Sequence, residues 1–358
     1  MGGGGPPRGG GGAGHRPAAP PRLADIAAQA GVSEATVSRV LNGKAGVAAP
    51  TRHRVLAALD VLGYERPVRL RQRSAGLVGL LVPELTNPIF PAFAQVIEQV
   101  LAGYGYTPVL CTQLPGGATE DELVEQLEER GVTGIVFLSG LHADTSADPS
   151  RYERLAARGV PFVLINGYNE RVDAHFVSPD DRAAARMAVR HLVELGHERI
   201  GLAIGPTRYV PARRKAEGFV SALHRMLGVE PERARTFVRP TLFGVEGGHA
   251  AADVLLDQGC TGIVCGSDLM ALGAIRAVRA RGLDVPSDVS VVGFDDSPLI
   301  AFTDPPLTTV RQPVRAMATA AVDALLEEIE GNPVQRTEFV FQPELVVRGS
   351  TSSPPPRS

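Results

Sequence analysis

The chain contains 358 residues, of which 44% are hydrophobic and 21% charged. This length predicts two or three domains, and this composition is typical of a soluble globular protein. The sequence has no run of about 18 apolar residues, which excludes a membrane-spanning helix.

Both ends of the chain are poor in large apolar residues. We expect disordered tails at residues 1–21 and 349–358. The first of these has no apolar stretch of the kind found in secretory signals, so we expect a cytoplasmic protein. The three cysteines, Cys111, Cys260 and Cys265, lie in or beside apolar runs without a metal-binding spacing. They are expected to be reduced, small hydrophobic residues, and no metal or cofactor is predicted.

The net charge of −3 conceals two oppositely charged regions. Residues 22–75 carry a formal charge of +5, whereas residues 76–358 carry −10. A small basic region attached to a large acidic one predicts a module that binds a polyanion and a second module with another role.

Residues 22–66 have the pattern of a small helical domain. Apolar residues recur at intervals of three and four from Leu23 to Leu62, which predicts three short helices. Gly31 suits the tight turn after the first helix, and Ser33 suits the N-cap of the second. This arrangement predicts a helix-turn-helix, whose second helix would enter the major groove of DNA. The alternative is a helical hairpin with no nucleic-acid role, but the polar face and basic flank favour DNA.

A basic linker is expected at residues 67–76, and a different pattern begins at Leu77. Short apolar runs now alternate with amphipathic stretches, which predicts a doubly wound α/β fold with parallel sheets. The number of runs favours two lobes within residues 77–348, divided near Ser178–Asp180. The predicted strands are 77–82, 107–110, 134–138, 162–165, 175–177, 200–204, 262–265 and 289–293. The predicted helices include 93–104, 120–130, 183–195 and 269–281.

Residues 22–64 resemble the DNA-binding head of the lactose-repressor (LacI/GalR) family. The resemblance rests on Ala-Gly-Val-Ser at 30–33 and Thr-Val-Ser-Arg-Val-Leu-Asn at 36–42, and it continues at Gly-Phe-Asp-Asp (293–296) and Pro-Leu-Thr-Thr (306–309). It implies an α+β multi-domain protein in which an all-α helix-turn-helix head precedes a two-lobed α/β body similar to periplasmic binding proteins. It also implies a homodimeric repressor that binds palindromic operator DNA and a small, sugar-like effector between its lobes. Several stretches further resemble the actinobacterial branch that controls maltose and α-glucan use.

The resemblance assigns roles to residues of the head. Glu34, Ala35 and Arg39 match positions that read bases, and arginine can pair with guanine O6 and N7. The positions that match phosphate contacts are Ser33, Thr36, Ser38, Asn42, Thr51 and Arg52. The linker is shorter than usual in the family. Leu70 is therefore either a wedge in the minor groove or part of a basic arm that contacts phosphates, with Arg69 and Arg71 beside it.

The resemblance also assigns residues to the effector cleft. These are Ile89, Phe90, Asn166, Lys215, Phe243, Ser267 and Asp295. Aromatic rings stack on the apolar faces of sugars, and polar side chains can bond sugar hydroxyls. Each position has a structural alternative: a phenylalanine can belong to the core, and Asp295 can tie a turn to backbone N–H groups.

Two further expectations concern neighbours of these residues. Lys215 stands where the family usually has arginine, so Arg213 or Arg214 is expected to compensate. Asp268 is expected to cap the following helix.

Other classes of protein fit the sequence less well. It lacks the glycine-rich nucleotide loops and the Gly-x-Ser-x-Gly motif of common enzyme families, so we expect no enzyme. A transport protein that binds sugars would not need the DNA-binding head. A regulator controlled by a non-sugar ligand or by a protein corepressor remains open.

Overall fold

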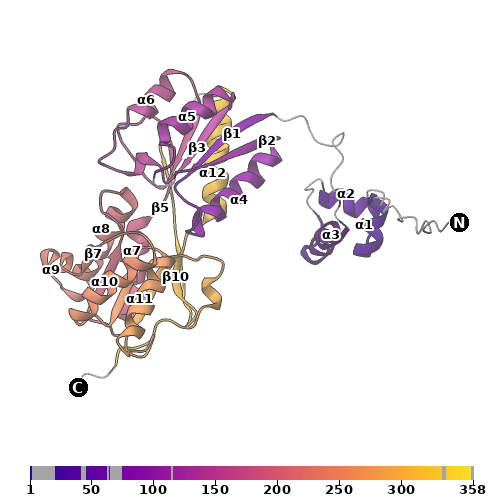
Figure 1. Cartoon of the computed structure of the whole chain (residues 1–358). Coiled ribbons are helices and arrows are strands. Elements are labelled where there is room, and N and C mark those ends of the chain that lie inside the picture. The colour runs from indigo at the N-terminus through magenta and orange to yellow at the C-terminus, as the bar shows by residue number, and fades with distance from the viewer. Residues whose placement is uncertain are drawn as a thin grey trace. The chain divides into compact units, whose positions relative to one another are not determined.

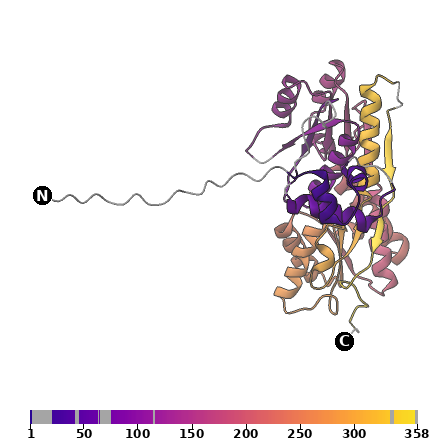
Figure 2. The same cartoon turned by 90° about the vertical axis from the view of Figure 1, so that its right-hand side faces the viewer.

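The computed structural model describes residues 1, 21–41, 46–62, 64, 75–113, 116–332 and 336–355. The chain divides into two compact units, residues 1–73 and 74–358, which we call the head and the body. Figures 1 and 2 draw the same chain in two views.

The described part of the head contains three helices. They are α1 (Leu23–Ala30), α2 (Glu34–Leu41) and α3 (Ala49–Leu62). Ile26, Val37 and Val55, one from each helix, are fully buried and form a common core. Gly31 joins α1 to α2 with a φ of 65°, a left-handed conformation that glycine adopts without strain. The three helices predicted from the sequence are thereby confirmed.

The body consists of two α/β lobes, each built on a six-stranded sheet with helices on both faces (Figure 1). In the N-lobe the strand order is β11-β5-β4-β3-β1-β2, and all neighbours are parallel. Its strands are β1 (Gly76–Val82), β2 (Tyr106–Thr112), β3 (Gly134–Leu138), β4 (Phe162–Ile165), β5 (His175–Pro179) and β11 (Glu338–Phe341). Its helices are α4 (Ile89–Gly103), α5 (Glu120–Glu129), the 3-10 turn η2 (Leu141–Ala143), α6 (Ser150–Ala157) and α12 (Val314–Ile329).

The C-lobe repeats this architecture with the order β12-β10-β9-β8-β6-β7. The neighbouring strands from β10 to β7 are parallel, as the sequence predicted, and the edge strand β12 is antiparallel to β10. The strands are β6 (Ile200–Ile204), β7 (Val238–Pro240), β8 (Gly262–Cys265), β9 (Ser290–Asp295), β10 (Thr308–Arg311) and β12 (Glu344–Val346). The helices are α7 (Asp181–Glu194), α8 (Val210–Leu227), α9 (Pro231–Arg235), α10 (Val245–Asp257), α11 (Asp268–Ala280) and the 3-10 turn η3 (Ile300–Phe302).

The chain passes between the lobes three times, not once. It first crosses between β5 and α7, close to the predicted division at Ser178–Asp180. It then returns to the N-lobe for α12 and β11, and crosses again to β12. Figure 1 shows the yellow helix α12 beside the purple elements of the N-lobe, although α12 lies near the end of the chain. The apolar face of α12, which includes Met317, Val322 and Leu325, shares a core with Phe93 and Ile97 of α4.

The C-terminal segment corrects one of the predicted boundaries. The expected disordered tail at 349–358 packs against the C-lobe over its described part. Ser350 is fully buried, and its hydroxyl accepts a hydrogen bond from the Thr308 backbone N–H and donates one to the Val291 carbonyl. The N–H of Ser352 donates to the Ser290 hydroxyl. These polar bonds left no signal in the hydrophobic pattern, so the sequence placed the boundary too early.

All three cysteines lie in hydrophobic clusters of the body. All three are free; Cys260 and Cys265 are buried and Cys111 is half-buried. Burial raises the pKa of Cys260 to about 12 and raises that of Cys265 as well, so both thiols stay protonated at neutral pH. No group of three His, Cys, Asp or Glu within the described ranges is arranged to hold a metal ion. No helix in the same part of the chain is long and apolar enough to cross a membrane.

Candidate nucleic-acid interface and interlobe cleft

Helix α2 has one buried face and one polar, accessible face. Val37 and Val40 pack into the core of the head, whereas Glu34, Ala35 and Arg39 are exposed. The hydroxyl of Ser33 accepts a hydrogen bond from the Thr36 N–H at 3.3 Å, which caps the helix as predicted. The half-buried Ser38 also lies on α2.

The remaining DNA-contact candidates divide into two groups. Thr51 and Arg52 lie in the first turn of α3, where Thr51 is half-buried and Arg52 is exposed. Asn42, Arg69, Leu70 and Arg71 lie outside the described residues. The choice between a minor-groove wedge and a basic arm therefore stays a prediction.

A cavity of about 410 Å³ lies between the lobes of the body. It forms where the carboxyl ends of strands in both sheets face one another, which is the usual position of ligand sites in open α/β folds. Six of the seven predicted effector residues line it: Ile89, Phe90, Asn166, Lys215, Phe243 and Asp295. The structure thus brings together residues that are up to 206 positions apart in the sequence.

Ser267 is the exception, and it corrects two expectations. Its hydroxyl accepts a hydrogen bond from the Met270 N–H at 3.2 Å, so Ser267 is the N-cap of α11 and does not line the cavity. Asp268, which was expected to be the cap, instead accepts bonds from the Ser297 N–H and the Thr309 hydroxyl. Gly266, which precedes Ser267, is the residue of this loop that lines the cavity.

The backbone at the cavity is strained. Ser139, Asn166 and Asp295 all line the cavity and have positive φ angles of 50°, 64° and 121°. Each lies at or just after the carboxyl end of a strand, namely β3, β4 and β9. Non-glycine residues rarely adopt such angles, and when they do they concentrate at ligand-binding sites. The strained residues thus lie at the edge of both sheets that faces the cavity.

Three buried hydrogen-bond acceptors in the cavity have no donor among the described residues. They are Asn166 Oδ1, Asp295 Oδ2 and Gln312 Oε1. The other polar atom of each of these side chains does form a hydrogen bond. Asn166 Nδ2 donates to the Ser139 hydroxyl at 3.2 Å, and Gln312 Nε2 donates to Asp295 Oδ1 at 2.7 Å. A buried acceptor without a donor is costly, so a ligand that supplies several donors would be stabilised here.

The charges in the cavity are close together and buried. Burial and the nearby Asp268 raise the pKa of Asp295 well above its usual value, and the pKa of Asp268 rises to about 6, chiefly through burial. Lys215 pairs with the buried Asp181 and lies 3.8 Å from the centre of the Phe294 ring. The adjacent Asp296 pairs with Arg311 and Arg348, and its charge also helps to raise the pKa of Asp268.

Neither arginine that was expected to compensate for Lys215 lines the cavity. Arg214 instead makes a two-pronged ion pair with Glu338 of the N-lobe, at 2.5 and 2.9 Å. Arg213 lies 3.8 Å from Glu217, one turn further along the same helix. The expectation is therefore wrong in this structure, because both guanidinium groups have other carboxylate partners.

Several lining residues were not predicted from the sequence. The most informative are Tyr209, Asp181 and Gln312. Each of them lies beside the end of a strand or the beginning of a helix. Asp181 follows the predicted strand 175–177 closely, so a search for polar residues after every predicted strand would have found it. Gln312 follows β10, a four-residue strand that the hydrophobic pattern did not reveal.

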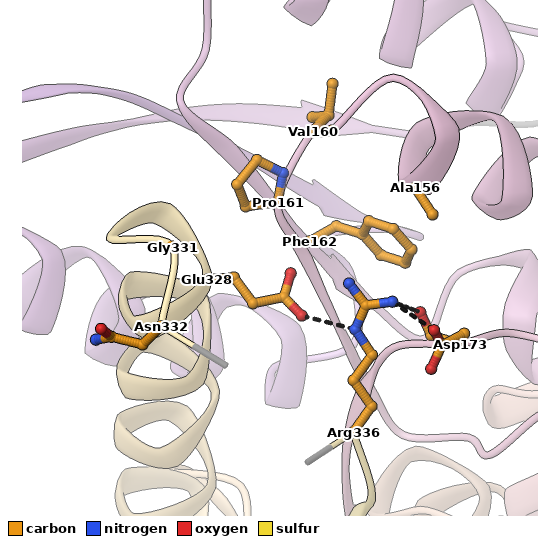
Figure 3. A pocket seen from close by; sticks show the side chains of 10 residues that line it. Ala156, Val160, Pro161, Phe162, Asp173, Glu328, Gly331, Asn332 and Arg336 are labelled. Carbon is orange, nitrogen blue, oxygen red and sulfur yellow. Dashed lines mark hydrogen bonds and ion pairs between the residues drawn. The ribbon is translucent and has the colours of Figure 1, made fainter. Parts of the chain in front are cut away.

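A second hollow in the N-lobe lies at the amino ends of the strands (Figure 3). Its charged residues bond to one another: Arg336 Nη1 donates to Asp173 Oδ2 at 2.6 Å, and Arg336 Nε lies 3.3 Å from Glu328 Oε1. Because these charges are mutually compensated, we assign no ligand to this hollow.

Comparison with known proteins identifies the class to which these two sites belong. The model for bacterial regulatory proteins of the lacI family matches residues 22–66, and the model for a periplasmic binding protein-like domain matches residues 189–351. The chain is 79% identical to an uncharacterized HTH-type transcriptional regulator in the aml 5' region of Streptomyces limosus, over 93% of this chain and 95% of that protein. It is 70% identical to the HTH-type transcriptional regulator MalR of Streptomyces coelicolor, over 93% and 97%.

Solved structures agree with this result. The transcriptional regulator CelR in complex with cellobiose has a TM-score of 0.68 at 32% identity and covers 92% of this chain and 99% of that one. The lac repressor dimer bound to operator and the anti-inducer ONPF has a TM-score of 0.66 at 29% identity and covers 93% and 100%. The chain belongs to the LacI family of DNA-binding transcriptional regulators.

Proposed function

We propose that this chain represses genes for the use of carbohydrates, specifically maltose and other α-glucans. We further propose that a sugar bound in the interlobe cavity controls the affinity of the chain for operator DNA. On this proposal it is a regulator without enzymatic activity and works in the cytoplasm, where the DNA is. The resemblance of the sequence to the actinobacterial branch for maltose and α-glucan use, together with its 70% identity to MalR, supports the pathway.

The observation that carries the sugar proposal is the set of three buried acceptors without donors, on Asn166, Asp295 and Gln312. A sugar presents several hydroxyl donors on a small ring. Phe90 and Phe243 line the same cavity and offer aromatic surface to the apolar faces of such a ring. The cellobiose complex of the similar regulator CelR agrees in ligand class.

We further propose that two copies of the chain bind one palindromic operator. A single head covers only one half-site, and a two-fold dimer doubles the contacts. The body exposes large apolar side chains that a second copy could cover, among them Leu110, Leu299 and Phe302, whose exposed fractions are 47%, 73% and 85%. The similar lac repressor structure is described as a dimer on operator.

The test combines two measurements on the full chain. Thermal unfolding is followed with maltose, maltotriose, glucose, cellobiose and ribose, and DNA binding is followed with and without each sugar. We expect at least one α-glucan to raise the melting temperature and to change DNA affinity. If no sugar does either, the sugar proposal is wrong, and a non-sugar ligand or a protein corepressor becomes the better explanation.

A further inference from the structure

A short segment of the N-lobe reaches the C-lobe next to the cavity. Residues 141–148 follow β3, and we call them the strap. Asp144 forms an isolated antiparallel bridge with Tyr209, and the Thr145 N–H and hydroxyl both donate to the Arg208 carbonyl, at 2.9 and 2.8 Å. Arg208 Nε donates to Asp144 Oδ2 at 2.9 Å. Two residues of the strap therefore hold the loop that leads into α8.

The base of the strap is fixed to the N-lobe by buried polar groups. Glu120 is 2% exposed, and its carboxylate accepts bonds from the Leu141 N–H at 3.0 Å and the Tyr152 hydroxyl at 2.6 Å. The N–H of His142 donates to the Tyr152 hydroxyl at 2.8 Å. Burial lowers the pKa of His142 to about 4, so the ring is neutral at pH 7 and its Nε2–H can donate to the Ile165 carbonyl, 3.1 Å away.

The tip of the strap is shaped by Asp144. One oxygen of its carboxylate accepts bonds from the N–H and the hydroxyl of Ser146, at 2.9 and 2.6 Å. The other oxygen is directed to Arg208. The strap is thus a preformed projection of the N-lobe, whose bonds to the C-lobe are all made at its tip.

The strap is separate from the covalent connections between the lobes. The chain crossings involve β5 and β11 at one edge of the N-lobe sheet, and β10 and β12 at one edge of the C-lobe sheet. The strap follows β3, and Arg208 follows β6, which are separated from those edges by other strands. Bonds at the strap therefore join the lobes at a place that the chain crossings do not hold together.

The strap also contacts the cavity directly. Leu141 and Ala143 at its base, and Tyr209 on the opposite side, are lining residues. We propose that the strap fastens the mouth of the interlobe cavity through Asp144 and Thr145, and that this fastening sets how fast a bound effector leaves. The part concerning effector release rests on the function proposed above, whereas the fastening itself does not.

The test weakens the contact between the strap and Arg208 by substitutions on either side of it, in the full chain. The variant D144N/T145V removes the ion pair and one hydroxyl bond from the strap, and R208A removes the guanidinium from the C-lobe. D148N is the matched control for the first, because Asp148 lies on the strap but bonds only to Ser150. R213A is the control for the second, because Arg213 is similarly exposed and pairs within its own helix.

Two readouts separate the fastening from the effector. Hydrogen exchange of residues 141–148 and 205–209 is expected to accelerate about tenfold in both test variants and in neither control, while β3 keeps the parent rate. Dissociation of maltose, used as the probe, is expected to accelerate by a similar factor.

Unchanged exchange at both segments in both test variants would overturn the proposal. Faster exchange with parent-like maltose dissociation would overturn its second half, the control of release. If maltose binds neither the parent nor the variants, the choice of sugar under the proposed function is wrong, and the exchange rates still decide whether the strap fastens the lobes.

Discussion

At the scale of single residues, Asp295 shows how a ligand site differs from a structural contact. One of its carboxylate oxygens bonds Gln312, and the other is buried without a donor. Among the described residues no backbone N–H donates to this carboxylate, in contrast to the structural alternative in which Asp295 ties its turn. The residue instead holds a costly, partly unsatisfied carboxylate at the cavity, which an effector could satisfy.

This arrangement predicts an unusual pH dependence for D295N. The folded-state pKa of Asp295 lies well above its unfolded value, so its ionisation lowers the free energy of unfolding as pH rises from about 4 through the folded pKa. D295N removes this loss. We therefore expect the free energy of unfolding of D295N at pH 7 to exceed that of the parent. We also expect a flatter pH profile and loss of the effector response, with DNA binding kept. Urea unfolding at pH 4.5 and 7 and DNA binding with effector measure these effects.

The control for this prediction is D296N. Asp296 is the adjacent carboxylate but pairs with Arg311 and Arg348, so its replacement should lower stability at pH 7. If D295N is instead the less stable variant at pH 7, Asp295 has a structural role and the anchor assignment fails.

Arg39 gives the corresponding prediction for the DNA-binding head. It is exposed on α2 and matches a base-reading position of the family. R39A should lose about 1–3 kcal/mol of discrimination per half-site if it pairs with guanine, with little change in its affinity for unrelated DNA. Fluorescence anisotropy with selected and scrambled duplexes measures both affinities. An unchanged preference for the selected duplex would contradict the assignment.

At the scale of elements, α11 shows how a cap can be mistaken for a ligand residue. Ser267 follows β8 closely and therefore lies at the predicted edge of the sheet, but its hydroxyl bonds the Met270 N–H. Asp268, one residue later, faces the Ser297 N–H and the Thr309 hydroxyl. A shift of one residue at a helix start thus makes Ser267 the cap and leaves Asp268 bonded to two other segments of the lobe.

S267A is expected to destabilise the C-lobe by about 1 kcal/mol, the usual effect of losing an N-cap hydroxyl. S267N should keep most of the parent stability, because its side-chain carbonyl can accept the same bond. Effector affinity should change little in either variant. Urea unfolding and calorimetry measure the two quantities. A large loss of effector affinity in S267A without a loss of stability would restore Ser267 as a ligand contact.

At the scale of the whole molecule, the proposed dimer is tested by measuring the molecular mass in solution. The chain has a mass of 37.7 kDa, and we expect sedimentation equilibrium at micromolar concentration to give about twice this value. Variants that place a charge at Phe302, which is 85% exposed, test whether this apolar surface is part of the contact. A monomer that binds a palindromic operator with full affinity would contradict the dimer.

The sequence by itself determined the classes of element. Helical periodicity, the Gly31 turn and the Ser33 cap identified the head, because these signals are local and each depends on a few neighbouring residues. The buried strands β3, β4, β6 and β8 were predicted with the boundaries that the structure has, because continuous apolar runs are typical of strands covered on both faces. The resemblance to a family then placed six lining residues correctly at the cavity.

Only the tertiary structure decided what depends on contacts between distant segments. The return of α12 and β11 to the N-lobe is fixed by the packing of α12 on α4 and by the pairing of β11 with β5, and neither leaves a local signal. The short strands β7, β10 and β12 are defined by their partners more than by their own three or four residues. The ion pairs of Arg208 with Asp144 and of Arg214 with Glu338 join residues 64 and 124 positions apart. Their geometry follows from how the two lobes face each other, which no local pattern encodes.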